Sequence, residues 1–298
     1  MPKFSANGVE IYYEVTGQGF PLVWCHEFGG SYESWESQVR FFTRRYQVIT
    51  YAARGWPPSD VPTNPDAYSQ DIIVNDLYLL LRHLSIGQAH IGGLSMGGSV
   101  TLNFGISHPE MAKSLIVASA GSGSTNRKTF LANGQAMTER LLSEGMEAVA
   151  KDYGTTDVRV QLLRKDPQGF EVFSRLLAAH SAIGSALTFQ GFVMNRPTVF
   201  ALEDKLRLLR VPTLIMIGDE DEPCIEPAIF MKRTIPMSGL SSFPQSGHAI
   251  NLEEPDMFNR TVLDFLTAVE ADRWAERLTS RSPPSPRPLG HINQLMCP

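Results

Sequence analysis

The most constraining feature of this sequence is the segment 93–97, Gly-Leu-Ser-Met-Gly, which matches the Gly-x-Ser-x-Gly pattern of a sharp strand-to-helix turn. An apolar, strand-like run at 88–94 leads into it, and a helix-like run at 96–108 follows. So tight a turn leaves no room for side chains at Gly93 and Gly97, two positions either side of Ser95. The Ser95 hydroxyl would then stand at the positive end of the next helix. The alternative is a glycine-rich turn whose serine only caps that helix, and Ser95 alone does not separate the two.

Composition narrows the class of protein. The 298 residues suffice for a large core, and 26 basic against 31 acidic residues give a net charge of −5 without charge blocks. This balance predicts neither a nucleic-acid partner nor binding to anionic membranes. The three cysteines, Cys25, Cys224 and Cys297, are odd in number and widely spaced, which argues against disulfides or a metal-ligand motif. The first residues lack the apolar core of a signal peptide, and no later stretch has transmembrane length, so we expect a cytoplasmic protein.

Strand-like and helix-like segments alternate through most of the chain. Continuous or alternating apolar runs predict strands, and apolar positions three to four residues apart predict helices. The expected strands are residues 9–16, 21–26, 47–51, 88–94, 114–119, 212–218 and 239–243. The expected helices are residues 35–46, 69–84, 96–108, 226–235 and 256 to about 278. This order predicts an α/β fold in which helices cover both faces of a mostly parallel sheet.

The alternation breaks at residue 121, and from 122 to about 204 the pattern is helical without a buried strand. We therefore expect a core made of residues 1–120 and 205–278, with a helical cap at 121–204 inserted over the sheet. Residues 279–298 are rich in proline and serine and are expected to form a disordered tail. The aromatic and sulfur-bearing side chains of the cap, Phe192 and Met194 among them, either line a pocket or hold the cap together.

Two later segments offer the partners that a serine nucleophile needs. A serine hydroxyl attacks only when a base removes its proton, and a third group must hold that base in the right tautomer. Four acidic residues, 219–222, directly follow an apolar strand, at the edge where open sheets gather their active sites. His248 follows the last expected strand, and among the seven histidines it has the context that positions a base. The chain order Ser95, acid, His248 is that of hydrolases with the Gly-x-Ser-x-Gly turn.

These motifs together resemble the α/β-hydrolase superfamily, in its branch of small esterases, lactonases and carbon–carbon bond hydrolases with a helical cap. The resemblance covers residues 8–270. It rests on four ordered motifs: His26-Glu27-Phe28-Gly29-Gly30, the turn around Ser95, Gly218-x-x-Asp221, and Gly247-His248 with Glu253-Glu254-Pro255 behind it. It implies the α/β-hydrolase fold, a mostly parallel central sheet flanked by helices with a helical cap insertion. It also selects Asp221 as the acid, because in similar proteins the acid lies three residues after the glycine.

The reaction of such a site places negative charge on a carbonyl oxygen, which fixed N–H groups must stabilise. The residue after the nucleophile, Met96, supplies one backbone N–H. By resemblance, the second donor of this oxyanion hole is the backbone N–H of Phe28. The chain carries Glu27 where the commoner motif reads His-Gly-Phe, so a side chain here either stiffens the loop or brings an acid near the site.

A second departure lies at residues 51–60, where relatives usually have an aspartate near Ala52 and another glycine near Pro57. Trp56 in this loop either contacts substrate or packs within the core. With Phe192 and Met194 it completes the set of candidate substrate-binding residues. A strongly anionic substrate would need a basic group from the cap, which the sequence alone does not orient. The available ones are Arg127, Lys128, Arg140, Arg164, Arg175 and Arg196.

The resulting expectation is a serine hydrolase for a small apolar or moderately polar ester or lactone, with no metal or organic cofactor. Ser95 would attack, His248 would accept and return the proton, and Asp221 would orient the imidazolium. Serine at the turn disfavours the epoxide-hydrolase and dehalogenase relatives, which use aspartate there. The alternatives are a carbon–carbon bond hydrolase or a perhydrolase with the same residues, or a non-catalytic ligand receptor on this fold. A homodimer is the base-rate expectation for assembly.

Overall fold

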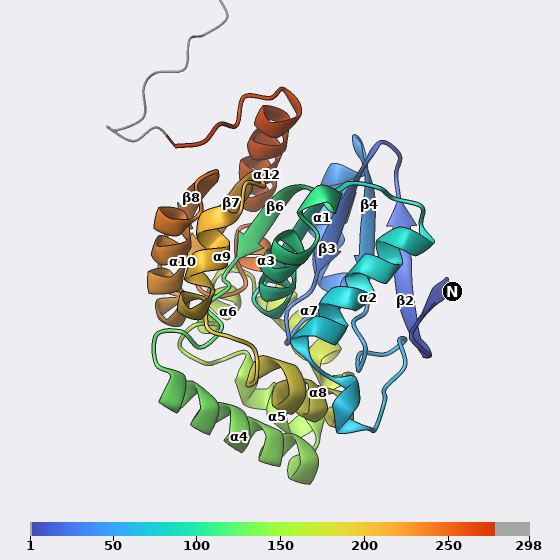
Figure 1. Ribbon diagram of the computed structural model, residues 1–298. Coiled ribbons are helices and arrows are strands. Elements are labelled where there is room, and N and C mark those ends of the chain that lie inside the picture. Colours follow the sequence, from blue (N-terminus) through green and yellow to red (C-terminus); the bar gives the residue numbers. More distant parts are fainter. Residues whose placement is uncertain (1, 278–298) are drawn as a thin grey trace, which may run out of the picture.

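The computed structural model describes residues 2–277, and these form one eight-stranded sheet with the order β1-β2-β4-β3-β5-β6-β7-β8 (Figure 1). The pairs β1–β2 and β2–β4 are antiparallel, and the other five are parallel. The mostly parallel sheet is therefore confirmed. The strands are β1 (Lys3–Ala6), β2 (Val9–Thr16), β3 (Phe20–Cys25), β4 (Tyr46–Tyr51), β5 (Ala89–Leu94), β6 (Ala112–Ala118), β7 (Thr213–Gly218) and β8 (Ser238–Phe243).

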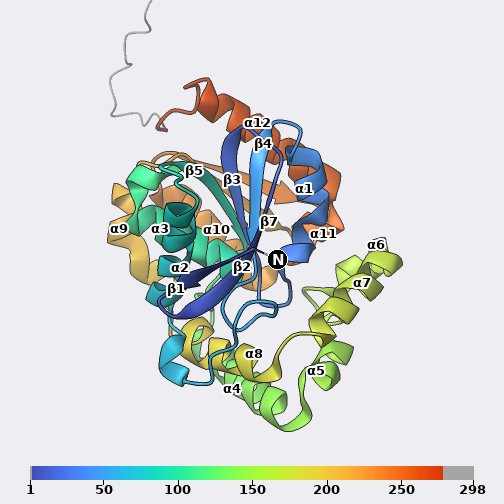
Figure 2. The ribbon, with the colours of Figure 1, turned by 90° about the vertical axis from the view of Figure 1, so that its right-hand side faces the viewer.

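Helices cover both faces of this sheet (Figure 2). On one face lie α2 (Gln70–His83), α3 (Met96–Ser107), α9 (Glu203–Leu208) and α10 (Glu222–Thr234). On the other lie α1 (Glu36–Phe42), α11 (Ile250–Glu253) and α12 (Pro255–Glu270). The central strands are apolar on both sides because both faces are buried. In β3, for example, Val23 packs into the core under α2 and α3, and its neighbour Trp24 packs into the core under α1 and α12.

The predicted helical insertion is present between β6 and β7. It contains α4 (Arg127–Glu144), α5 (Met146–Tyr153), α6 (Val160–Lys165), α7 (Pro167–Ala178), α8 (Ala182–Thr188) and a π-helical turn at Phe189–Val193. The helices α4, α7 and α8 begin at capping residues. The side chains of Asn126, Asp166 and Ser181 accept hydrogen bonds from backbone amides in the first turn of each helix. The insertion lies beyond the carboxyl ends of the parallel strands, at the bottom of Figure 1. Short 3-10 helices occupy Tyr32–Trp35, Pro65–Ala67, Pro109–Met111 and Phe200–Leu202.

Three expected helices have different ends in the structure. The helix expected over 35–46 is shorter, at Glu36–Phe42, and the one expected from 226 begins four residues earlier, at Glu222. The helix expected to reach about residue 278 stops at Glu270. Asp272 takes a positive φ of 53°, and the chain turns so that Trp274 packs against Phe265 and donates a hydrogen bond to the Met237 carbonyl.

The expected tail at 279–298 lies outside the described residues. Across residues 2–277, no single helix combines the length and apolar composition needed to cross a membrane. The helices Pro167–Ala178 and Ala182–Val193 satisfy that test only as a pair, across a 90° bend.

Candidate active site

Ser95 lies in the turn between β5 and α3 and has the backbone angles φ 55° and ψ −107°. Its N–H donates to the Ala118 carbonyl of β6 at 2.8 Å, which ties the turn to the sheet. A Cβ atom on Gly93 would collide with the Gly97 carbonyl, and one on Gly97 would collide with the Cys25 carbonyl. Ser95 makes no side-chain capping bond to α3. The geometry therefore contradicts the alternative of a capping serine, and the strained position exposes the hydroxyl instead.

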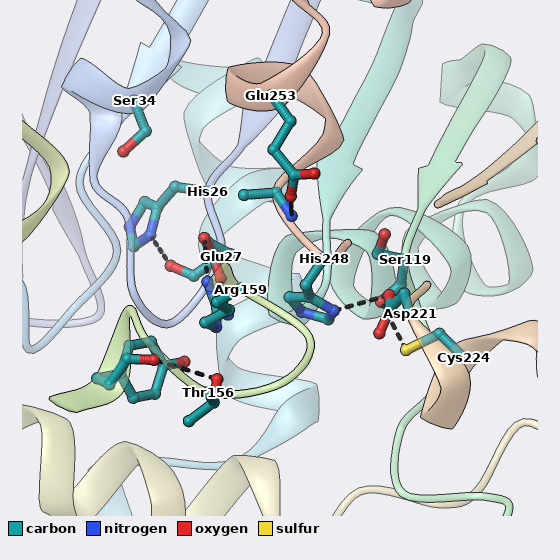
Figure 3. A network of polar contacts seen from close by, with 12 residues as sticks. His26, Glu27, Ser34, Ser119, Thr156, Arg159, Asp221, Cys224, His248 and Glu253 are labelled. Carbon is teal, nitrogen blue, oxygen red and sulfur yellow. Dashed lines mark hydrogen bonds and ion pairs between the residues drawn. The ribbon is translucent and has the colours of Figure 1, made fainter. Parts of the chain in front are cut away.

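His248 and Asp221 meet at the carboxyl ends of β8 and β7 (Figure 3). The Nδ1 atom of His248 lies 2.8 Å from Oδ2 of Asp221, and the carboxylate is 1% exposed. The backbone N–H of His248 donates to the Val158 carbonyl of the insertion at 2.7 Å. An acid on one ring nitrogen directs the other nitrogen toward the cavity, as a general base requires.

The other candidate acids at 219–222 have different partners. Asp219 accepts the Ser246 backbone N–H at 3.2 Å, and Glu220 accepts the Gln161 side-chain amide at 2.7 Å. Glu222 begins α10. Of the four acidic residues, Asp221 is the one that contacts His248.

Glu253 holds the loop that carries His248. Its two carboxylate oxygens accept the backbone N–H groups of Gly247 at 2.7 Å and Ala249 at 3.0 Å, one on each side of the histidine. Burial raises the pKa of Glu253, and these two hydrogen bonds oppose that rise. Glu253 belonged to a motif in the sequence, but its positioning role was not predicted.

The loop after β3 carries the proposed oxyanion donor Phe28, and His26 shapes it. Nδ1 of His26 bonds to the Glu27 carbonyl at 2.7 Å, and Nε2 accepts the Ala53 backbone N–H at 3.0 Å. The ring is therefore neutral with its proton on Nδ1, and burial lowers the pKa of His26 to about 4. The backbone N–H groups of Phe28 and Met96 donate to no other described residue, and both residues line the same cavity as Ser95.

Glu27, the departure from the common loop motif, forms a buried ion pair with Arg159 of the insertion. Glu27 is 2% and Arg159 is 7% exposed. The guanidinium donates to both carboxylate oxygens, Nη1 to Oε1 at 3.0 Å and Nη2 to Oε2 (Figure 3). It also lies 4.5 Å from the centre of the Tyr153 ring. Burial would raise the pKa of Glu27, but Arg159 outweighs this effect and lowers it. Both side chains therefore stay charged, and the pair fastens the loop that carries Phe28 to the insertion.

A cavity of about 340 Å³ connects these groups, at the low end of the range for small-molecule sites. Ser95, Met96, Phe28, Asp221 and His248 all line it. Its other walls are mostly apolar and come from the insertion, the loop after β6 and the start of α10: Ser119, Gly121, Ser122, Gly123, Phe130, Asn133, Gly134, Met137, Tyr153, Thr156, Val158, Arg159, Phe189, Val193, Arg196, Pro223 and Cys224.

The three candidate substrate-binding residues lie elsewhere. Trp56 is fully buried against His26 and Phe28, Phe192 is fully buried in the insertion, and Met194 is half-buried. None of the three lines the cavity. The spacing of apolar residues in the sequence does not distinguish side chains that line a pocket from side chains that pack in the core.

A larger hollow of about 970 Å³ lies at the amino ends of the parallel strands, between α3 and α9. It is lined by Gln88, Lys113, Pro212 and Met237, each next to or at the start of a strand, and by Trp274. Active sites of open parallel sheets lie at the opposite edge. This hollow also lacks a nucleophile beside a base, so size alone does not identify the site.

Asp221, Cys224 and His248 are the one set of side chains in the described residues that brings three metal-binding atoms together, within 4.8 Å of one another. The set fits a metal poorly. Nδ1 of His248 already bonds to Asp221, and burial raises the pKa of the Cys224 thiol well above its ordinary value. A metal would need that thiol as a thiolate.

The constellation can perform proton transfer and acyl transfer. Ser95 and His248 line one cavity, but no hydrogen bond joins their side chains among the described residues. Such bonds are often long in unliganded enzymes and shorten when substrate binds.

Comparison with known proteins agrees with this architecture. Among curated proteins, the chain is similar to 3-oxoadipate enol-lactonase 2 of Acinetobacter baylyi, with 27% identity over 261 residues, 87% of this chain and 93% of that protein. It is 28% identical over 274 residues to a putative non-heme chloroperoxidase of Synechocystis, covering 87% of this chain and 95% of the relative.

Solved structures give the same result. A thermophilic esterase from Thermogutta terrifontis superposes with a TM-score of 0.80 and 26% identity, covering 90% of this chain and 97% of that one. The enol-lactonase from Burkholderia xenovorans shares the fold, with a TM-score of 0.79 at 20% identity over 89% of this chain and all of that one. A family model described as alpha/beta hydrolase fold matches residues 21–255. Since that match spans most of the sequence, this chain belongs to the alpha/beta hydrolase fold family.

Proposed function

We propose that this protein is a serine hydrolase that cleaves carboxylic esters or lactones through an acyl-enzyme intermediate. The observation that carries the proposal is the buried His248–Asp221 pair, which lines the same small cavity as the strained Ser95. The similarity to an enol-lactonase and an esterase supports ester or lactone cleavage.

The first half-reaction forms the acyl-enzyme. Nε2 of His248 accepts the proton as Ser95 Oγ attacks the acyl carbon, while Asp221 stabilises the imidazolium. The developing oxyanion accepts hydrogen bonds from the backbone N–H groups of Phe28 and Met96, which have no other partner among the described residues. When the tetrahedral intermediate collapses, His248 returns the proton to the leaving alkoxide oxygen, and the ester bond breaks.

The second half-reaction restores the enzyme. Water attacks the acyl carbon, His248 takes one of its protons, and the acid leaves as the proton returns to Ser95 Oγ. For a lactone, the leaving alkoxide stays attached to the acyl group, and one hydroxy acid is the product. In both cases atoms balance with water as the only co-reactant.

The test compares hydrolysis of short p-nitrophenyl esters by the wild type with that by Ser95→Ala and His248→Ala. We expect both variants to lose about 10⁴-fold or more in kcat, because nucleophile and base act as a unit. Ser99→Ala, one turn further along the same helix and outside the cavity, is the matched control and should stay near the wild-type rate.

Intact-mass measurement after brief exposure to a slow ester should show one acyl group on the wild type and none on Ser95→Ala. Near-normal turnover by His248→Ala would show that the base is misassigned. Binding of esters without any product from the wild type would favour the ligand-receptor alternative.

A further inference from the structure

Arg196 is a buried cation in the wall of the cavity that contains Ser95. It follows the π-helical turn Phe189–Val193 near the end of the insertion and is 6% exposed. Its Nε and Nη1 atoms are buried and bond to no described residue. No carboxylate of a described residue lies within ion-pair distance of its guanidinium.

The surroundings of Arg196 do not neutralise its charge. The nearest cation, Arg127, donates hydrogen bonds to the backbone carbonyls of Met194 and Arg196. The neighbouring Cys224 is a neutral thiol, because burial raises its pKa well above the ordinary value. The Phe192 ring, 5.4 Å from the guanidinium, supplies only a cation–π contact. Burial and the like charge of Arg127 lower the pKa of Arg196 to about 10, so the side chain stays charged at neutral pH.

The other buried arginines of the described residues show what this position lacks. Arg54 donates to both oxygens of Asp76, each at 2.6 Å, and Arg159 donates to both oxygens of Glu27. An unpaired buried charge is strongly destabilising, and buried arginines normally face a carboxylate for that reason. Arg196 alone among the three has no carboxylate from this chain, and it alone leaves buried donors unsatisfied beside the reactive serine.

We propose that the substrate supplies the missing carboxylate: the enzyme acts on an ester or lactone that also bears a free carboxylate, and Arg196 binds that group. This inference rests on the proposed hydrolase function and adds the substrate class. Arg196 is a substrate-binding residue here, because its donors contact a part of the substrate that does not react. The apolar remainder of the cavity wall holds the carbon chain between the carboxylate and the acyl carbon.

The test uses substrate pairs that differ by one charge. Mono-p-nitrophenyl glutarate and p-nitrophenyl pentanoate carry the difference in the acyl group, and 4-acetoxybutanoate and butyl acetate carry it in the alcohol. We expect the wild type to prefer the anionic member of at least one pair in kcat/KM. Arg196→Met should lower kcat/KM for the anionic substrate about 10- to 100-fold, the range that corresponds to a hydrogen bond to a charged group. For the neutral substrate, kcat/KM of this variant should stay within about 3-fold of the wild-type value.

Two further variants calibrate this result. Arg196→Lys keeps the charge and should retain part of the preference. Arg175→Met removes an equal charge from the exposed surface of α7 and should behave as the wild type. Because Arg196→Met removes an uncompensated buried charge and keeps an apolar stem, we expect its melting temperature to be unchanged or higher.

Calorimetric titration of Ser95→Ala with glutarate separates this inference from the proposed mechanism. Glutarate should bind, and adding Arg196→Met should abolish that binding. If Ser95→Ala remains active, the nucleophile is misassigned, but Arg196-dependent glutarate binding would still support the carboxylate site.

Three results would overturn the carboxylate site. The first is a wild type with no preference for charge in either pair. The second is an equal loss by Arg196→Met on neutral and anionic substrates together with a lower melting temperature, which indicates a structural role. The third is binding of inorganic phosphate without binding of glutarate, which assigns the site to another oxyanion.

Discussion

Glu27 and Arg159 are 132 residues apart in the sequence, and each is buried. Neither charge is tolerable without the other, because the desolvation cost of a buried ion must be offset by a partner. Their side chains join the loop that carries Phe28 to the loop between α5 and α6. The side chain at position 27 therefore fastens this loop to the insertion. The nearby His248 also lowers the pKa of Glu27, so the same side chain brings an acid near the candidate site, and both outcomes expected from the sequence occur together.

Glu27→Gln should destabilise the protein by about 3–5 kcal/mol, because it leaves Arg159 charged and unpaired in the interior. Urea unfolding at pH 7 measures this change, and kcat/KM should fall as the Phe28 amide loses its fixed position. The double variant Glu27→Leu with Arg159→Met removes both charges and should recover most of the stability. A Glu27→Gln protein as stable as the wild type would show that the ion pair contributes nothing to the fold.

Single-residue roles were predictable where a local motif carries them. Ser95, Asp221 and His248 come from short motifs whose spacing defines their place on a strand end, and the structure brings Asp221 and His248 together. Arg159 and Arg196 carry no such motif. Their roles depend on which part of the core the insertion reaches, and this is a tertiary contact that no local spacing encodes. For the same reason the sequence could not decide whether the candidates Trp56, Phe192 and Met194 line the cavity. None of them does: Trp56 and Phe192 pack inside the protein, and Met194 is half-buried.

At the scale of elements, the turn between β5 and α3 is the tightest junction in the site. Gly97 is the second residue of α3 and lies against the end of β3, where a side chain would overlap the Cys25 carbonyl. That overlap involves backbone on both sides, so neither partner can move without disturbing the sheet. The position of Ser95 therefore depends on the absence of two Cβ atoms.

Gly97→Ala should prevent correct folding or lower the melting temperature by about 6 °C or more, since overpacking against backbone costs about 3 kcal/mol or more and each kcal/mol shifts a domain of this size by roughly 2–4 °C. Gly87→Ala is the matched control, because a Cβ at Gly87 meets no atom within 4 Å. It should change stability by less than about 0.5 kcal/mol. Thermal unfolding of both variants, followed by circular dichroism, decides the matter. Equal melting temperatures would show that the turn tolerates a side chain.

The strands and most helices were predictable because burial on both faces produces long apolar runs. Each expected strand starts and ends within two residues of the observed one. The edge strand β1 was not predicted, because four residues with two exposed side chains give too short a pattern. The end of α12 was missed for another reason. Its sequence continues a helical pattern, but the packing of Trp274 on Phe265 turns the chain back.

At the scale of the whole molecule, three histidines with lowered pKa values, His26, His90 and His180, make the fold sensitive to acid. Burial lowers the pKa of His26 to about 4, and burial with the nearby Lys113 lowers the pKa of His90 to about 3. His90 also contacts Glu270 at 3.3 Å, but that carboxylate is largely exposed and does not offset the burial. Burial and the nearby His26 lower the pKa of His180 to about 3. All three rings are therefore neutral in the folded state at pH values where the unfolded chain would protonate them.

Stability should fall as the pH drops from about 6.5 to about 4. In this window the unfolded chain binds protons at all three histidines and the folded protein does not, so each ring contributes about 1.4 kcal/mol per pH unit. Urea unfolding at half-unit pH steps measures the slope. Because glutamine does not titrate, the plot of unfolding free energy against pH should be less steep for His90→Gln by the contribution of one histidine. The difference between the wild-type and variant plots then gives the contribution of His90. Identical slopes for the wild type and His90→Gln would contradict the assignment.

The insertion leaves the sheet after β6 and returns to it at β7, and these two strands are hydrogen-bonded neighbours. Its entry and exit points therefore lie side by side, and the segment can be exchanged for one of different length without changing the strand order. The proposed nucleophile, base and acid all belong to the surrounding core, whereas Arg159 and Arg196 belong to the insertion. In chimeras that exchange this segment between related chains, we therefore expect the core to keep catalysing the same reaction. The substrate preference should follow the protein that donated the insertion.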